Sequence, residues 1–221
     1  MASNYKILKV RDKSDSYYTE TPLFDIPMRL LICGRSQLSG KTTVILNLLA
    51  NPDFPYHKMF KGENIHIVSN NQLDNKELLY DQMEQDFMEE IELGKPANRL
   101  IIFDDCGFSG SLRNKNAGII SRMICNGRHL NLSQIYTCQK YSQCSTTLRT
   151  NITGGIFFGT SMRELESISE DFNYFDDKKK FVQMFRDATK KPRSFLVVNF
   201  SRGIDPATLY YDTDFNPILL K

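Results

Sequence analysis

Residues 28–43 read MRLLICGRSQLSGKTT, and this stretch decides the fold that we expect. The apolar run at 28–33 ends at Gly34, as a buried strand does, and the helical run TTVILNLLA stops before Pro52. The connecting loop, GRSQLSGKTT, supplies glycines and a lysine at the start of the helix. Backbone N–H groups, the positive end of a helix dipole and a flexible cation together bind phosphate. We therefore predict a phosphate-binding loop that follows a strand and opens a helix.

Each residue type in this loop has a physical role. Gly34 and Gly40 permit the turn, Lys41 reaches the β- and γ-phosphates, and the Thr42 hydroxyl holds magnesium. The predicted nucleotide-binding residues are Gly34, Ser39, Gly40, Lys41, Thr42 and Thr43. Five residues separate the two glycines, where the usual motif has four. The loop is therefore either one residue longer than usual or starts at Arg35, without a glycine.

Two acids follow a third apolar strand, in the run LIIFDDC. A carboxylate at the end of such a strand lies beside a bound metal, whose charge offsets its burial. We assign Asp104 to the magnesium shell, through water. Asp105 is expected to be the base that orients the attacking water. Without the phosphate loop, these acids would indicate only a polar turn.

Gln139 ends the next strand, where a neutral amide can contact both the γ-phosphate and the attacking water. An arginine from a neighbouring subunit can stabilise transition-state charge, an effect worth roughly three to five orders of magnitude in rate. Arg128, in NGRHLN, is the first candidate for this role and Arg149, in LRTN, is the second. Each is also of the kind that forms ordinary surface salt bridges.

The polar loop GFSGSLRNKN follows the acidic strand and lacks a helical period. In a ring with its nucleotide sites between subunits, such a loop can face a central pore. Arg113 and Lys115 would then contact the DNA backbone without reading its sequence. An ordinary solvent-exposed loop is the alternative reading.

The overall composition excludes several classes of protein. The net charge of +2 is uneven: residues 74–92 carry eight carboxylates and one lysine, whereas residues 106–163 carry no carboxylate. The five cysteines form no CxxC pair, which argues against a disulfide framework or a zinc site. No run approaches the ~18 apolar residues of a membrane span, so we expect an intracellular protein.

Strands alternate with helices along the chain, which predicts an α/β fold with a mostly parallel sheet and ligands at the strand carboxyl ends. Further strands are expected at residues 64–70, 99–105, 132–139, 154–160 and 194–200, and helices at 75–93, 116–126, 163–175 and 178–189. Residues 1–27 are an N-terminal extension with a candidate edge strand at 5–10. Residues 28–160 are the ATPase core, and 161–221 complete the same domain.

In their order, these motifs resemble the viral DNA-packaging ATPases of the FtsK–HerA superfamily. The resemblance covers residues 28–172 and rests on the phosphate loop, on NIHIVSNNQLDN, RLIIFDDC and NGRHLNLSQIYTCQKY, and on LRTNITGGIFF. The run from Gly127 to Tyr141 is the most telling, because a generic phosphate loop does not predict it.

This resemblance implies a RecA-like P-loop NTPase that uses ATP and Mg²⁺, with the Gln139 strand between the phosphate-loop strand and the Asp104 strand. It implies a homo-oligomeric ring of five or six subunits that threads double-stranded DNA into a capsid. It adds Lys41, Thr42, Asp104, Asp105 and Gln139 as nucleotide-site residues. The expected partners are DNA and capsid or packaging-vertex proteins, and the expected location is the site of virion assembly in an infected cell.

Three alternatives stay open at this stage. A nucleotide or nucleoside kinase also pairs a phosphate loop with aspartates, and would use residues 186–193 as an arginine-rich lid. That reading leaves NGRHLNLSQIYTCQ unexplained. The others are a cellular or conjugative DNA translocase, and a capsid or scaffold protein with a degenerate phosphate loop.

Overall fold

The computed structural model describes residues 17–36, 39–69, 85–86, 88–90, 97–105 and 116–219. The candidate edge strand at 5–10 lies outside these ranges, as do Arg113 and Lys115. Within the predicted helix at 75–93, the described residues 85–86 and 88–90 are helical.

The strands and helices alternate through most of the described chain. The strands are β1 (Arg29–Cys33), β2 (Ile65–Ser69), β3 (Arg99–Asp104), β4 (Leu132–Cys138), β5 (Gly154–Phe158), β6 (Phe195–Asn199) and β7 (Tyr210–Tyr211). The helices are α1 (Lys41–Ala50), α3 (Asn116–Asn126), α4 (Thr146–Asn151), α5 (Met162–Phe172), α6 (Lys178–Ala188) and α7 (Pro206–Leu209). Short 3₁₀ helices include η2 (Pro55–Lys58), η6 (Gly127–Leu130) and η7 (Tyr141–Gln143).

In the described part of the chain, the strands form one seven-stranded sheet in the order β2-β3-β4-β1-β5-β6-β7. The first five strands in the chain pair in parallel, and β6 and β7 continue the sheet antiparallel beyond β5. The predicted mostly parallel sheet is therefore confirmed. The implied neighbours of the Gln139 strand are also found, because β4 lies between β1 and β3.

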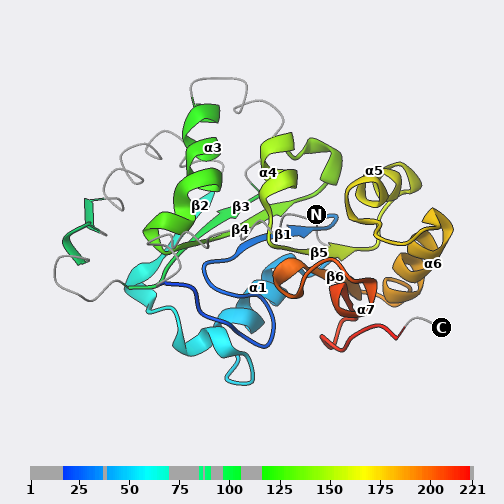
Figure 1. Ribbon diagram of the computed structural model, residues 1–221, viewed down its shortest axis with the longest axis horizontal. Helices are drawn as coiled ribbons and strands as arrows, with labels where there is room; N and C mark the ends of the chain where they lie inside the picture. The colour runs from blue at the N-terminus through cyan, green and yellow to red at the C-terminus, as the bar shows by residue number, and fades with distance from the viewer. Residues whose placement is uncertain are drawn as a thin grey trace, which may run out of the picture.

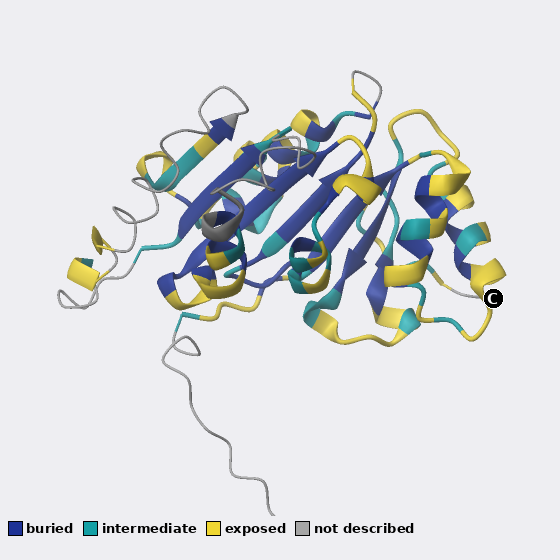
Figure 2. Cartoon of the chain, turned by 90° about the horizontal axis from the view of Figure 1, so that it is seen from above, coloured by how far each residue is buried: buried dark blue, intermediate teal, exposed yellow. Residues whose placement is uncertain are grey.

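Helices cover both faces of the sheet (Figure 1), with α1 on one face and α3, α4 and α5 on the other. Alternate residues of β1 enter the two cores: Leu31 packs toward α3 and α5, whereas Leu30 packs toward α1. The central strands are dark blue along most of their length in Figure 2, whereas the edge strand β2 is partly exposed. Burial on both faces explains why these strands read as continuous apolar runs.

Residues 23–26, within the segment 17–27, pack on the α1 side of the sheet. Phe24 and Ile26 are buried in that core together with Tyr56 of η2. The Tyr56 hydroxyl donates to the Phe24 carbonyl at 2.8 Å, and the Phe24 amide donates back to it at 2.6 Å. This exchange fixes the entry into β1, and hence the position of the phosphate loop at its other end.

Candidate functional site

Gly34 lies at the start of the phosphate loop because there is no room for a side chain there. Its amide donates to the Cys138 carbonyl at 3.0 Å. A Cβ built on Gly34 would lie 2.6 Å from the Cβ of Ser39 and 2.8 Å from the Phe158 ring. The close approach therefore requires glycine at this position, although the spacing to Gly40 is one residue longer than usual. Residues 37 and 38 of the loop lie outside the described ranges.

Gly40 turns the loop into α1. It is the N-cap residue, in the left-handed region with φ 91° and ψ 26°. Ser39 beside it is buried, and its hydroxyl donates to the Arg35 carbonyl at 2.8 Å. An N-cap glycine offers no side-chain acceptor to the N–H groups of the first turn, and helix starts of this kind bind anions.

Lys41 is the first residue of α1 and is buried, with 9% of its surface exposed. Its Nζ donates to the Gly34 carbonyl at 2.7 Å, so the side chain folds back over the loop toward β1. Thr42 and Thr43 follow in the same turn and are exposed. The predicted nucleotide-binding residues thus surround one helix start.

The two acids at the end of β3 are organised by Thr137, a buried residue of β4. The Thr137 hydroxyl donates to Asp104 Oδ1 at 2.9 Å and accepts the Asp105 amide at 2.7 Å. Asp105 adopts a left-handed backbone with φ 45°, which turns the chain out of the strand. Thr137 was not among the site residues predicted from the sequence. Its place two residues before Gln139, on the same face of one strand, is the signal that was available.

Gln139 extends this network from the end of β4. Its Nε2 donates to Asp105 Oδ2 at 2.6 Å. Lys41, the two acids and Gln139 are therefore brought to the carboxyl edge of three adjacent strands, β1, β4 and β3. The sequence placed the acids and Gln139 at strand ends and Lys41 at the start of the helix after β1, and the sheet order makes them neighbours.

A polar cavity of about 570 Å³ borders Gln139 on its exposed side. Three cations line it: Arg35 from the phosphate loop, Lys140 after β4, and Arg163 from α5. The buried Glu164 carboxylate in the same wall accepts the amide and the hydroxyl of Ser142. From the sequence, Arg35 was noted only as a possible start of the loop, and Lys140 and Arg163 only as part of the stretch without carboxylates. Their positions give this side of the loop a positive lining.

The two candidate arginines differ sharply in their surroundings. Arg149 forms an ion pair with Asp171 at 3.0 Å and lies 5.5 Å from the centre of the Tyr141 ring. Arg128 is exposed in η6, before β4 begins. The phosphate loop lies at the opposite end of the parallel strands, about 20 Å away over the seven residues of β4. Arg128 is therefore not placed at the phosphate loop of its own chain.

A cluster of buried thiols lies near this site, at the ends of β1 and β4. Hydrogen bonds with Cys144 and Cys33, together with burial, raise the pKa of the Cys138 thiol. The Cys144 and Cys138 sulfur atoms are 3.5 Å apart, and both residues are free cysteines. A protonated, buried thiol is a poor nucleophile, so this cluster serves packing.

Two negative findings apply to the described residues. They contain no group of three or more His, Cys, Asp or Glu side chains arranged to hold a metal ion. They also contain no helix long and apolar enough to cross a membrane.

A phosphate loop after β1, acids after β3 and an intervening β4 define a RecA-like P-loop NTPase. Within that class, the profile described as Poxvirus A32 protein matches residues 15–205, and the chain belongs to this family. This membership confirms the resemblance to viral DNA-packaging ATPases that the sequence motifs indicated. A comparison with curated protein sequences gives no match.

Solved structures share the fold at low sequence identity. The genome packaging NTPase B204 from Sulfolobus turreted icosahedral virus 2, in complex with AMP, is 15% identical, with a TM-score of 0.56 over 87% of this chain and 99% of that chain. B204, the DNA-packaging ATPase from Sulfolobus turreted icosahedral virus, is 14% identical, with a TM-score of 0.54 over 88% and 99%. ATPases 2 and 3 of EssC from Geobacillus thermodenitrificans are 13% identical, with a TM-score of 0.51 over 79% and 38%.

Proposed function

We propose that this chain is an ATPase that moves double-stranded DNA into a viral capsid. The observation that carries the proposal is the meeting of Lys41, the Asp104–Asp105 pair and Gln139 at one edge of the sheet. Membership of the Poxvirus A32 protein family supports the viral context. The fold shared with B204, the DNA-packaging ATPase from Sulfolobus turreted icosahedral virus, supports the packaging role.

The residues present fit a nucleotide with magnesium. The Gly34 position admits no side chain, the N-cap glycine leaves the start of α1 open to an anion, and Lys41 reaches into the loop. Thr42 and Asp104 would hold Mg²⁺, the carboxylate through water. Few protein ligands are needed, because Mg²⁺ in nucleotide sites keeps waters and phosphate oxygens as ligands. B204 has been solved with AMPPCP and with ATP-gammaS, which supports ATP as the nucleotide.

The chain's own groups then perform distinct tasks. Lys41 neutralises phosphate charge, and the bound Mg²⁺ supplies further positive charge to the phosphates. The Asp105 carboxylate orients the attacking water and accepts its proton. Gln139 donates its amide N–H to that carboxylate, and it would exchange this partner for the γ-phosphate when nucleotide is bound. Hydrolysis is thereby coupled to a change at the end of β4.

A catalytic arginine would come from a neighbouring subunit. Arg128 is the better candidate, because it is exposed and lies at the opposite edge of the sheet from its own phosphate loop. Arg149 is engaged by Asp171. A ring of five or six subunits would bring one subunit's Arg128 edge to the next subunit's nucleotide.

The remaining partners follow from the packaging role. Arg113 and Lys115 would grip the DNA backbone from a pore-facing loop. Capsid or packaging-vertex proteins would hold the ring at the portal of the shell. The place of action would be the site of virion assembly inside the infected host cell.

Replacement of Lys41 tests the assignment of the phosphate loop. Lys41→Ala should abolish ATP hydrolysis while circular dichroism and the melting profile show an intact fold. Lys61→Ala, which removes an exposed lysine far from the loop in sequence, should hydrolyse ATP at the rate of the unchanged protein. Normal turnover by a well-folded Lys41→Ala protein would show that the loop is wrongly assigned.

A further inference from the structure

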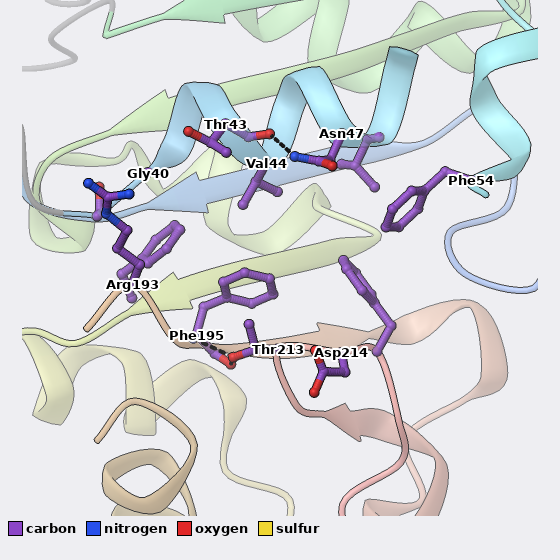
Figure 3. Close-up of a pocket in the computed structure, with 13 residues that line it drawn as sticks. Gly40, Thr43, Val44, Asn47, Phe54, Arg193, Phe195, Thr213 and Asp214 are labelled. Atoms are coloured by element: carbon purple, nitrogen blue, oxygen red, sulfur yellow. Dashed lines mark hydrogen bonds between the residues drawn. The ribbon is translucent and has the colours of Figure 1, made fainter. Parts of the chain in front are cut away.

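A cavity of about 370 Å³ opens beside the start of α1 (Figure 3). It is separate from the polar cavity that borders Gln139. Gly40 and Thr43 form the wall where it meets the phosphate loop, and Asn47 continues that wall along α1. The opposite wall comes from β5, β6 and the segment around Phe215. Its volume falls within the range of small-molecule sites, and it is continuous with the phosphate loop.

Four phenylalanines that contact one another line part of the cavity. The Phe158 and Phe195 rings have centroids 5.2 Å apart and are nearly perpendicular. Phe215 packs edge-on against Phe195 at 5.8 Å and against Phe54 at 5.5 Å. Edge and face surfaces of this kind accept a planar ring by stacking and dispersion. The cavity therefore suits a flat heterocycle.

Arg193 extends from the opposite wall toward Gly40 (Figure 3). It belongs to the turn formed by residues 191–194, closed by a hydrogen bond from the Ser194 amide to the Lys191 carbonyl at 3.1 Å. Pro192 precedes it, and Arg193 itself has φ 63°. This is the third position of a type II turn, which glycine normally occupies because other residues are strained there.

An arginine held in this strained position indicates a role for its side chain, since glycine would fit the turn better. Its guanidinium is a fixed fork of donors suited to phosphate oxygens. Among the described residues, the ion pairs within 4.0 Å are formed by other cations, and Arg193 has no carboxylate partner there. The side chain thus presents its charge to the space above the loop.

We propose that this cavity holds the nucleoside of the bound nucleotide, with the base among the phenylalanine rings and Arg193 on the phosphate next to the ribose. This inference rests on the proposed function, because it places the nucleoside of the same ATP molecule whose phosphates are assigned to the loop. The β- and γ-phosphates would occupy the loop near Lys41, and the α-phosphate would lie between Gly40 and Arg193.

A substitution that fills the cavity distinguishes binding of the nucleoside from binding of the phosphates. Asn47→Trp should weaken ATP binding by at least about tenfold, because the indole occupies the space of the base. The same variant should bind inorganic tripolyphosphate as tightly as the unchanged protein does. Leu46→Trp is the matched control, since Leu46 is the preceding residue of α1, is 59% exposed and does not line the cavity. Isothermal titration calorimetry measures both ligands.

Equal ATP affinity in Asn47→Trp and Leu46→Trp would overturn the nucleoside site. Failure of the unchanged protein to bind either ATP or tripolyphosphate would instead contradict the proposed function. Binding of tripolyphosphate with no gain in affinity for ATP would overturn the nucleoside site alone.

Arg193→Gly tests the contribution of the arginine to ATP binding in a variant that should remain folded. Glycine relieves the backbone at φ 63°, so the melting temperature should stay the same or rise. ATP affinity should nevertheless fall by about tenfold, as expected for loss of a charge-assisted contact. Lys191→Ala removes a neighbouring cation that does not line the cavity and should leave ATP affinity unchanged. Unchanged ATP affinity in a stable Arg193→Gly protein would overturn the role of Arg193.

Discussion

Thr137 links the two acids through one hydroxyl. It accepts the Asp105 amide and donates to Asp104 Oδ1, and it is fully buried in β4. A single hydroxyl thereby sets both the turn after β3 and the direction of one carboxylate. It acts on the reaction by positioning Asp104 and Asp105, which are the residues proposed to hold the metal and the water.

Thr137→Val keeps the shape of the side chain and removes its hydroxyl. The Asp105 amide would lose its acceptor, at a cost of about 1–3 kcal/mol in the free energy of unfolding. ATP turnover should fall, because both carboxylates lose their common anchor, and Thr137→Ser should restore it. Denaturant titration and steady-state hydrolysis measure the two effects. A Val variant with full turnover, or a Ser variant as poor as Val, would contradict the positioning role.

At the residue scale, the sequence predicted site residues best where a polar or charged side chain stands at the end of a strand. Asp105 and Gln139 were predicted from such positions, and Lys41 from the loop that opens α1. Their mutual contacts were not predictable, because the Gln139–Asp105 hydrogen bond depends on β4 lying beside β3. Thr137 went unnoticed because threonine is common in strands.

At the element scale, η2 holds the segment 17–27 against the α1 face through the Tyr56 hydroxyl. Burial raises the pKa of Tyr56 to about 12, because its ionised form would lose the solvent that stabilises it. The unfolded chain releases this proton near pH 10. The folded state binds the proton more tightly, so this contribution to stability is complete below about pH 10 and is lost as the pH rises toward 12.

The free energy of unfolding should therefore decline between about pH 10 and 12. Tyr56→Phe should be less stable at neutral pH, since the Phe24 amide and carbonyl lose their partner. The free energy of unfolding of this variant should also fall less steeply with pH, because one tyrosine with a raised pKa is absent. Denaturant titrations across this range measure both effects. Identical slopes for the two proteins would contradict the assignment to Tyr56.

The elements were predictable to different degrees. Strands β1, β3 and β4 are buried on both faces and stand out as apolar runs between helices. The antiparallel direction of β6 is not written in its composition, because a buried strand reads alike in either direction. The short elements α4, α7 and β7 were not predicted, since six residues or fewer give too little periodicity.

At the scale of the whole molecule, the chain presents two different edges. One carries the phosphate loop, the acids and Gln139, and the other carries Arg128 at the start of β4. A nucleotide site completed across subunits needs this separation, since the donor edge of one copy can then meet the acceptor edge of the next. Closed rings arise from such head-to-tail contacts when the rotation closes.

The most direct test of the central claim is the rate of ATP hydrolysis with and without double-stranded DNA, together with the mass of the protein in solution. We predict turnover that double-stranded DNA stimulates and that coincides with assembly into a ring. Turnover that ignores DNA and requires a nucleoside or nucleotide acceptor would contradict the motor and identify a kinase. Absence of turnover from an assembled ring in the presence of DNA would contradict the claim of an ATP-driven motor.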